Sequence, residues 1–90
     1  DDLNVDPAAK QLLGDAYVEL GEYGKAAKAF ESAAESGNDI IAPMSLKKAG
    51  LVYLHEGQNG KALKAFKAIK ADYPDSAEAQ DIDKYIAIAE

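Results

Sequence analysis

The sequence predicts an all-α domain of five helices, arranged as two helix-turn-helix repeats followed by a C-terminal capping helix. Three observations lead to this prediction. Shifting the 90-residue chain by 36 residues places residues 7–30 on residues 43–66, and ten of those 24 positions are identical. Apolar residues recur at three- and four-residue spacing in both units. Alanine, a strong helix former, supplies 18 positions. We therefore expect one domain over residues 1–90, with a lead-in (1–6), two repeats (7–36 and 42–73) and a capping helix (75–90).

The first helix of each repeat begins near a proline. Pro7 and Pro43 suit the first helical turn, where the missing N–H costs nothing, and Asp6 is a suitable N-cap. We expect these helices to end at about Leu20 and Glu56. Each carries a buried apolar stripe with a glycine inside it, and we expect a neighbouring helix to approach closely there. The stripe residues are Leu13, Gly14, Tyr17 and Leu20 in the first unit, and Leu46, Ala49, Gly50 and Tyr53 in the second.

Glycine-rich turns at residues 21–24 and 57–60 are expected to join the two helices of each unit, with glycine supplying a positive φ. The glycine spacing could also suggest a phosphate-binding loop. Neither turn follows a strand or leads into Lys-Ser/Thr, so that interpretation fails. The second helices are expected over about residues 25–35 and 61–71. Their inward faces comprise Ala26, Ala29, Phe30 and Ala33, and Ala62, Ala65, Phe66 and Ile69.

A single capping helix is expected after Pro74. Asp75, with Glu78 three residues later, predicts a capping box at its start. Its apolar face consists of Ile82, Tyr85, Ile86 and Ala89. The opposite face carries Asp81, Asp83 and Lys84. Two carboxylates without further ligands nearby indicate a solvated surface rather than a metal site.

Charge is segregated along the chain. Residues 1–42 carry a net charge of −6, residues 43–70 carry +5 and residues 71–90 carry −5, which leaves the chain at −6. A basic middle between two acidic flanks could steer an acidic partner, or it could match neighbouring elements of one stack, and we favour the second interpretation. One row of lysines is expected to face outward beside the acidic capping helix: Lys61, Lys64, Lys67 and Lys70.

The composition argues against several classes of function. Without cysteine there is no disulfide scaffold or cysteine-based zinc module. Without arginine and at net charge −6, nucleic-acid binding is not expected. No apolar run approaches the roughly 18 residues that span a bilayer, so we expect no membrane insertion. His55 has no cysteine or second histidine as a partner, and no serine lies in a nucleophile motif. We therefore expect no catalytic residues, no metal and no cofactor.

Both units resemble the tetratricopeptide repeat. The resemblance covers about residues 7–74 and implies a right-handed α-solenoid. Two features depart from the family pattern: Lys10 and Leu46 replace the usual bulky aromatic residue, and the period is 36 rather than about 34 residues. The two extra residues fit in the loop at residues 37–41. The residues that carry the resemblance are Leu13, Gly14, Tyr17, Gly21, Ala26, Phe30 and Ala33, and then Gly50, Tyr53, Gly57, Ala62, Phe66, Tyr73 and Pro74.

The resemblance also implies a concave groove, lined by the first helix of each unit, that takes extended peptides or partner helices. Members of the family that clamp the carboxylate tails of chaperones use lysine and asparagine there, and Asp15 and Leu51 occupy the asparagine positions in this chain. That difference argues against such a clamp. The candidate groove residues are Ala8, Gln11, Leu12, Asp15, Val18 and Glu19, and Met44, Lys47, Lys48, Leu51, Leu54 and His55.

Two functions therefore remain open. The first is a non-catalytic scaffold that binds a peptide or partner protein through the groove. The alternative is a structural or oligomerisation module whose apolar groove is filled by a second copy of the chain, as in a homodimer, or by upstream repeats. The chain starts at Asp1 rather than Met, and we expect it to belong to a longer protein.

The end of the chain carries a further resemblance. Residues 73–86 look like the ends of bacterial tetratricopeptide proteins that an N-terminal helix holds to the inner membrane. This resemblance implies a location on the periplasmic side of that membrane, within a longer anchored protein. The alternative location is the cytoplasm.

Overall fold

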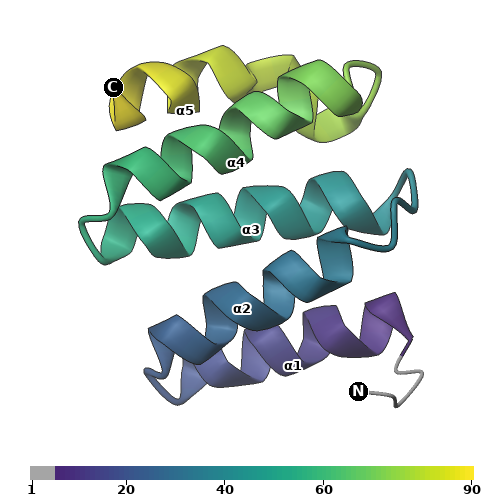
Figure 1. Ribbon diagram of the computed structural model, residues 1–90, viewed down its shortest axis with the longest axis vertical. Coiled ribbons are helices and arrows are strands. Elements are labelled where there is room, and N and C mark those ends of the chain that lie inside the picture. The colour runs from purple at the N-terminus through teal and green to yellow at the C-terminus, as the bar shows by residue number, and fades with distance from the viewer. Residues whose placement is uncertain (1–5) are drawn as a thin grey trace.

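A computed structural model describes residues 6–90, and five α-helices and one short 3-10 helix account for most of this range. Neighbouring helices run antiparallel and lie side by side in chain order (Figure 1). The molecule measures 35 × 27 × 17 Å along its principal axes. The all-α helical architecture is therefore confirmed for residues 6–90, while the handedness of the solenoid stays a prediction. The elements are α1 (Pro7–Glu19), α2 (Tyr23–Ala34), α3 (Ile41–His55), α4 (Asn59–Asp72), η1 (Ala77–Asp81) and α5 (Ile82–Ala89).

The predicted helix ends are close to those observed, but the turns are shorter than predicted. The Asp6 side chain caps α1 as expected, because its Oδ1 accepts a hydrogen bond of 2.8 Å from the Ala8 amide. Gly21 and Gly57 have φ values of 74° and 73°. The positive φ of this single glycine in each turn is enough to reverse the direction of the chain. As a result, α2 and α4 begin two residues earlier than predicted. The placement of Gly24 and Gly60 in the turns is therefore wrong; both lie inside helices.

A glycine of the first helix and a phenylalanine ring of the second make the same close contact in both units. A Cβ atom at Gly14 would lie 2.6 Å from Phe30 Cδ1, and one at Gly50 would lie 2.8 Å from Phe66 Cζ. Both rings are almost completely buried. Because neither ring has room to move, only glycine fits against it. This contact confirms the close helix approach that the mid-helix glycines predict.

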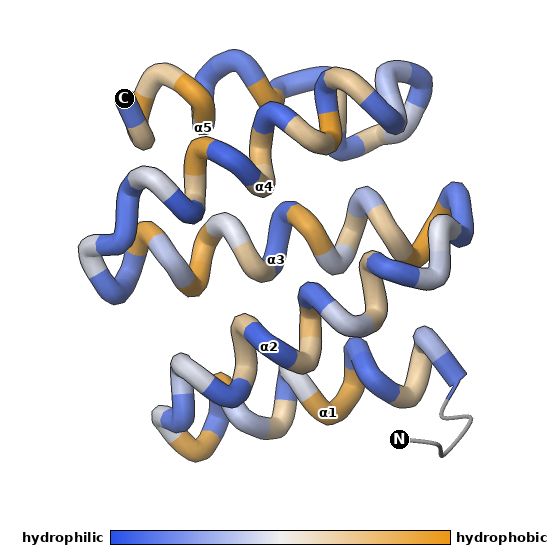
Figure 2. The backbone as a smooth tube through the Cα atoms, in the orientation of Figure 1, coloured by the Kyte–Doolittle hydropathy of each residue, from blue (hydrophilic) through white to orange (hydrophobic). Residues whose placement is uncertain are grey.

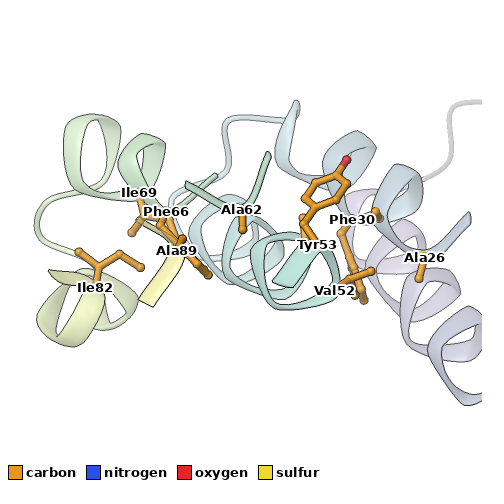
Figure 3. Packing of buried hydrophobic residues seen from close by; sticks show 11 residues of the cluster. Ala26, Phe30, Val52, Tyr53, Ala62, Phe66, Ile69, Ile82 and Ala89 are labelled. Carbon is orange, nitrogen blue, oxygen red and sulfur yellow. The ribbon is translucent and has the colours of Figure 1, made fainter. Parts of the chain in front are cut away.

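The hydrophobic core runs through both units and ends beneath α5. Figure 3 shows Phe30 and Val52 toward one end of the cluster, and Ile69 and Ile82 toward the other. Ile82 and Ala89 are buried, and the Tyr85 ring lies 5.6 Å from the Phe66 ring between centroids. The predicted apolar face of the capping helix is confirmed, because α5 covers the exposed side of α4.

The predicted buried stripe of α1 is wrong at two positions. Leu13 is 48% exposed and Leu20 is 73% exposed. At the position equivalent to Leu13, Ala49 is fully buried, because α2 packs against that side of α3. Among residues 6–90, no helix covers the corresponding side of α1. Hydrophobic segments occur on α1 as they do on the inner helices (Figure 2), so position in the stack decides the exposure.

The start of the capping segment also differs from the prediction. Ser76, rather than Asp75, is the N-cap: its Oγ accepts a hydrogen bond of 3.2 Å from the Ala79 amide and donates one of 2.8 Å to the Tyr73 carbonyl. The capping box predicted for Asp75 and Glu78 is therefore wrong. The single helix predicted over 75–90 is in fact the 3-10 helix η1 followed by the α-helix α5.

Candidate functional site

The predicted groove residues lie on α1 and α3, two helices that contact each other, and polar side chains join the two helices. Gln11 Nε2 donates a hydrogen bond of 2.9 Å to Ser45 Oγ. Lys48 Nζ lies 2.7 Å from Asp15 Oδ1. These contacts join residues more than 30 positions apart in the sequence and fix how the two helices lie side by side. We call the surface formed by the predicted groove residues the inner face.

The other side of α3 contacts the C-terminal segment. Lys47 Nζ lies 3.3 Å from Asp81 Oδ1 and 4.7 Å from the centroid of the Tyr85 ring. The ammonium group therefore meets a carboxylate and the face of an aromatic ring, both of which attract a cation. Both lysines predicted for the groove are thus held by acidic groups from neighbouring elements.

The same arrangement explains the charge segregation of the sequence. Lys47 and Lys48 pair with Asp81 and Asp15, and a third pair joins Lys70 Nζ to Asp83 Oδ1 at 2.8 Å. Each of the three pairs connects the basic middle of the chain to one of its acidic flanks. The interpretation that these charges match neighbouring elements is confirmed for these three pairs. All three are at least partly exposed, so each contributes little stability, about 0–1 kcal/mol.

The apolar residues of the predicted groove are not equally accessible. Val18 and Leu54 are half-buried and pack against the core, whereas Leu51 is 41% exposed. Leu12 is 67% exposed. The shift of 36 residues makes Leu12 equivalent to Lys48. Because Lys48 extends from α3 toward Asp15 on α1, the equivalent side chain on α1 points away from α3, and Leu12 lies near the outer edge of α1. Leu51 is therefore the main accessible apolar side chain in the middle of the inner face.

His55 and Glu19 lie where α1 and α3 end, and both are exposed. The imidazole ring packs against the Tyr23 ring at a tilt of 34° with centroids 4.4 Å apart, and its Nδ1 lies 3.1 Å from Glu56 Oε2. This contact places the imidazole at one end of the inner face, next to the turn between α1 and α2. Ala8 is exposed near the other end of α1, and Met44 is half-buried in the first turn of α3.

Comparisons with known proteins add no assignment. Protein-family models, curated proteins and solved structures show no match to this chain. Between residues 6 and 90, no helix is both long and apolar enough to cross a lipid bilayer. Within the same range, no group of three or more His, Asp or Glu side chains is placed to hold a metal ion.

One contact of the second unit could not be predicted from the sequence. The Tyr53 hydroxyl donates a hydrogen bond of 2.7 Å to Glu31 Oε2, across 22 residues from α3 to α2. Burial raises the pKa of Tyr53 to about 12, and the hydrogen bond to Glu31 and the negative charge of that carboxylate act in the same direction. The three- and four-residue spacing of the apolar stripe marks Tyr53 as a core residue, but no sequence signal identifies its partner.

Proposed function

We propose that this chain is a non-catalytic protein-interaction scaffold of the tetratricopeptide type, which binds a peptide or partner protein on the inner face. The observation that carries the proposal is the environment of Leu51. This side chain is 41% exposed in the middle of the face, while the neighbouring lysines, Lys47 and Lys48, are held by carboxylates. An apolar centre surrounded by ordered polar groups is the usual anatomy of a protein interface.

The ion pairs that hold Lys47 and Lys48 in the free chain affect the affinity of the inner face for a ligand. Association costs free energy whenever flexible side chains become fixed, at about 0.5–1.5 kcal/mol for each long side chain. Lys47 and Lys48 are already paired in the free chain, which lowers this cost. A ligand that covers Leu51 also gains the free energy of burying apolar surface, about 25 cal/mol per Å².

A peptide-display selection on the immobilised chain tests this proposal. Peptides selected on the wild type should lose at least about tenfold in affinity for Leu51→Asp, because the substitution places a carboxylate at the apolar centre. The matched control is Ile88→Asp, which introduces the same charge at an apolar residue of α5 that is 58% exposed. Circular dichroism verifies that both variants fold. Equal losses for both variants would remove the inner face as the binding site.

A different surface favours the alternative function, a structural or oligomerisation module. We call it the outer face of α1, and it consists of Ala9, Leu13, Ala16 and Leu20, all exposed. A shift of 36 residues relates three of them to Ser45, Ala49 and Val52, which are 0%, 0% and 7% exposed where α3 packs beside α2. The outer face of α1 therefore resembles the surface of α3 that packs against α2. A further helix, from a second copy of the chain or from an upstream repeat, could pack against it in the same way.

The mass of the chain in solution distinguishes the two functions. Light scattering after gel filtration is carried out on the wild type, Leu13→Asp and Leu51→Asp. A dimer that only Leu13→Asp dissociates supports the alternative through the outer face of α1. A dimer that only Leu51→Asp dissociates assigns the inner face to self-association. A monomer in all three samples leaves the inner face free for a partner and favours the scaffold.

A further inference from the structure

A hollow of about 480 Å³ lies where the loop before α3 meets the loop between α4 and η1. Its volume is within the range of small-ligand pockets, about 300–1,000 Å³. We call it the loop pocket. Ile40 is 67% exposed at its edge, although a large apolar side chain gains free energy when it is covered. The apolar part of its wall consists of Ile40, Met44, Tyr73, Pro74 and Ala77.

Both loops around the pocket are held by hydrogen bonds of their own side chains. Asn38 Oδ1 accepts hydrogen bonds of 2.8 Å from the amides of Ile40 and Ile41. On the other side, Ser76 Oγ bridges the Tyr73 carbonyl and the Ala79 amide. The walls are therefore formed before any ligand binds, and little conformational entropy is lost on binding.

The charged groups of the pocket are all negative. Four carboxylates line it, and no lysine of the described range does. None of the four forms an ion pair within residues 6–90, whereas Asp15, Asp81 and Asp83 elsewhere on the surface each hold a lysine. The apolar wall thus lies in a negative potential that has no cation from the described chain to balance it. The four carboxylates belong to Asp39, Asp72, Asp75 and Glu78.

The occupant must satisfy both the apolar wall and the negative charge. A bare metal ion would satisfy only the charge, and no three acidic side chains of residues 6–90 converge enough to hold one. Lysine and arginine side chains combine an aliphatic stem with a cationic head. The Tyr73 ring offers a further favourable surface for such a head. We propose that the loop pocket binds a lysine or arginine side chain, next to an apolar residue, on a peptide segment of a partner protein.

This proposal does not depend on binding at the inner face. The loop pocket shares only Met44 with the predicted groove residues. None of the substitutions in the test below lies on the inner face. Failure of one proposal therefore leaves the other intact.

The test uses an end-blocked pentapeptide of alternating leucine and lysine, titrated into the isotope-labelled chain and followed by amide chemical shifts. The largest shifts are expected around Ile40 and Tyr73. The double variant Asp72→Asn/Asp75→Asn should weaken binding about fivefold or more, because two exposed carboxylates are lost. The matched control is Glu22→Gln/Glu35→Gln, which removes the same charge from two exposed acids outside the pocket and should change the affinity less than about twofold.

A second pair of variants tests the apolar half of the site. Ile40→Ser should weaken binding, whereas Ile88→Ser, at a comparably exposed isoleucine, should not. Several results would overturn the proposal: no binding, shifts centred on the inner face, or equal losses in the two double variants, which would show a response to net charge alone. Calcium ions that produce the same shifts, or a peptide with glutamate in place of lysine that binds equally well, would also overturn it.

Discussion

The two helical units make the same glycine-phenylalanine contact, yet they bury their first helices to different extents. On α1 only Gly14 is buried, whereas seven residues of α3 are buried. The difference arises from the neighbours, because α3 lies between α2 on one side and α4 and η1 on the other. A shared sequence pattern therefore specifies the same local fold, while the number of neighbouring helices decides how much of the surface of each first helix is buried.

The largest expected effect is a difference in stability between charged substitutions at equivalent positions of the two units. Ala49→Asp places a charge at a fully buried site and should destabilise the chain by at least about 4 kcal/mol. Leu13→Asp, at the equivalent position of α1, should cost no more than about 1 kcal/mol, since Leu13 is 48% exposed. Urea denaturation followed by circular dichroism measures both. Similar losses would show that the outer face of α1 is covered in solution.

The next effect concerns the glycines that face the two rings. Gly50→Leu should cost about 3 kcal/mol, at the upper end of overpacking effects, because α3 is held on both sides and cannot move away from Phe66. Gly14→Leu should cost less, about 1–2 kcal/mol, because α1 can shift toward its open side. The control is Gly60→Ala, where no heavy atom lies within 4 Å and a gain of up to about 1 kcal/mol is expected. Equal costs at Gly14 and Gly50 would contradict this explanation.

A smaller effect is the pH dependence of the stability that the Tyr53 hydroxyl contributes to the second unit. Tyr53→Phe removes the hydrogen bond to Glu31 and should cost about 1–2 kcal/mol near pH 8. The pKa of Tyr53 is about 12 in the folded chain and about 10 when unfolded, so the unfolded chain loses this proton first as the pH rises. The stability that the hydroxyl contributes is therefore complete below pH 10 and falls between pH 10 and about 12.

Urea denaturation of the wild type and Tyr53→Phe at several pH values measures this effect. The difference between the two free energies of unfolding should be constant up to about pH 9 and then shrink. Comparing the two proteins at each pH separates the effect from the titration of the lysines, which both contain. A difference that stays constant to about pH 12 would show that the hydroxyl has no raised pKa.

The sequence predicts the helices and the Gly14 and Gly50 contacts because these depend on local spacing. It fails at Leu13 and Leu20, where the same spacing is present but the covering helix is absent from the described residues. It also misplaces the last N-cap, since Asp75 and Ser76 are both acceptable caps and only the fold selects between them. Periodicity reports which face of a helix is apolar, and not whether another element covers that face.

Prediction of the candidate site is limited in the same way. Register places Lys47, Lys48 and Leu51 on one face, but the ion pairs that hold the two lysines depend on how α1, α3 and η1 pack. The loop pocket combines residues from positions 39–44 and 72–78, and no motif in the sequence connects these segments. Such surfaces follow from tertiary packing and become visible only with the fold.

The smallest expected effect is the difference in stability between breaking an ion pair that joins the two units and breaking one at the C-terminal end. Lys48→Met breaks the pair with Asp15, whose side chains are 35% and 42% exposed, and should cost up to about 1 kcal/mol. Lys70→Met breaks the pair with Asp83, at 60% and 74% exposure, and should cost less than about 0.5 kcal/mol. Thermal unfolding at low and high salt measures both, and salt should abolish the Lys70 effect first. If Lys48→Met costs no more than Lys70→Met, the pair between α1 and α3 contributes only to the placement of the inner face. The stability of the joint between the units would then come from apolar packing alone.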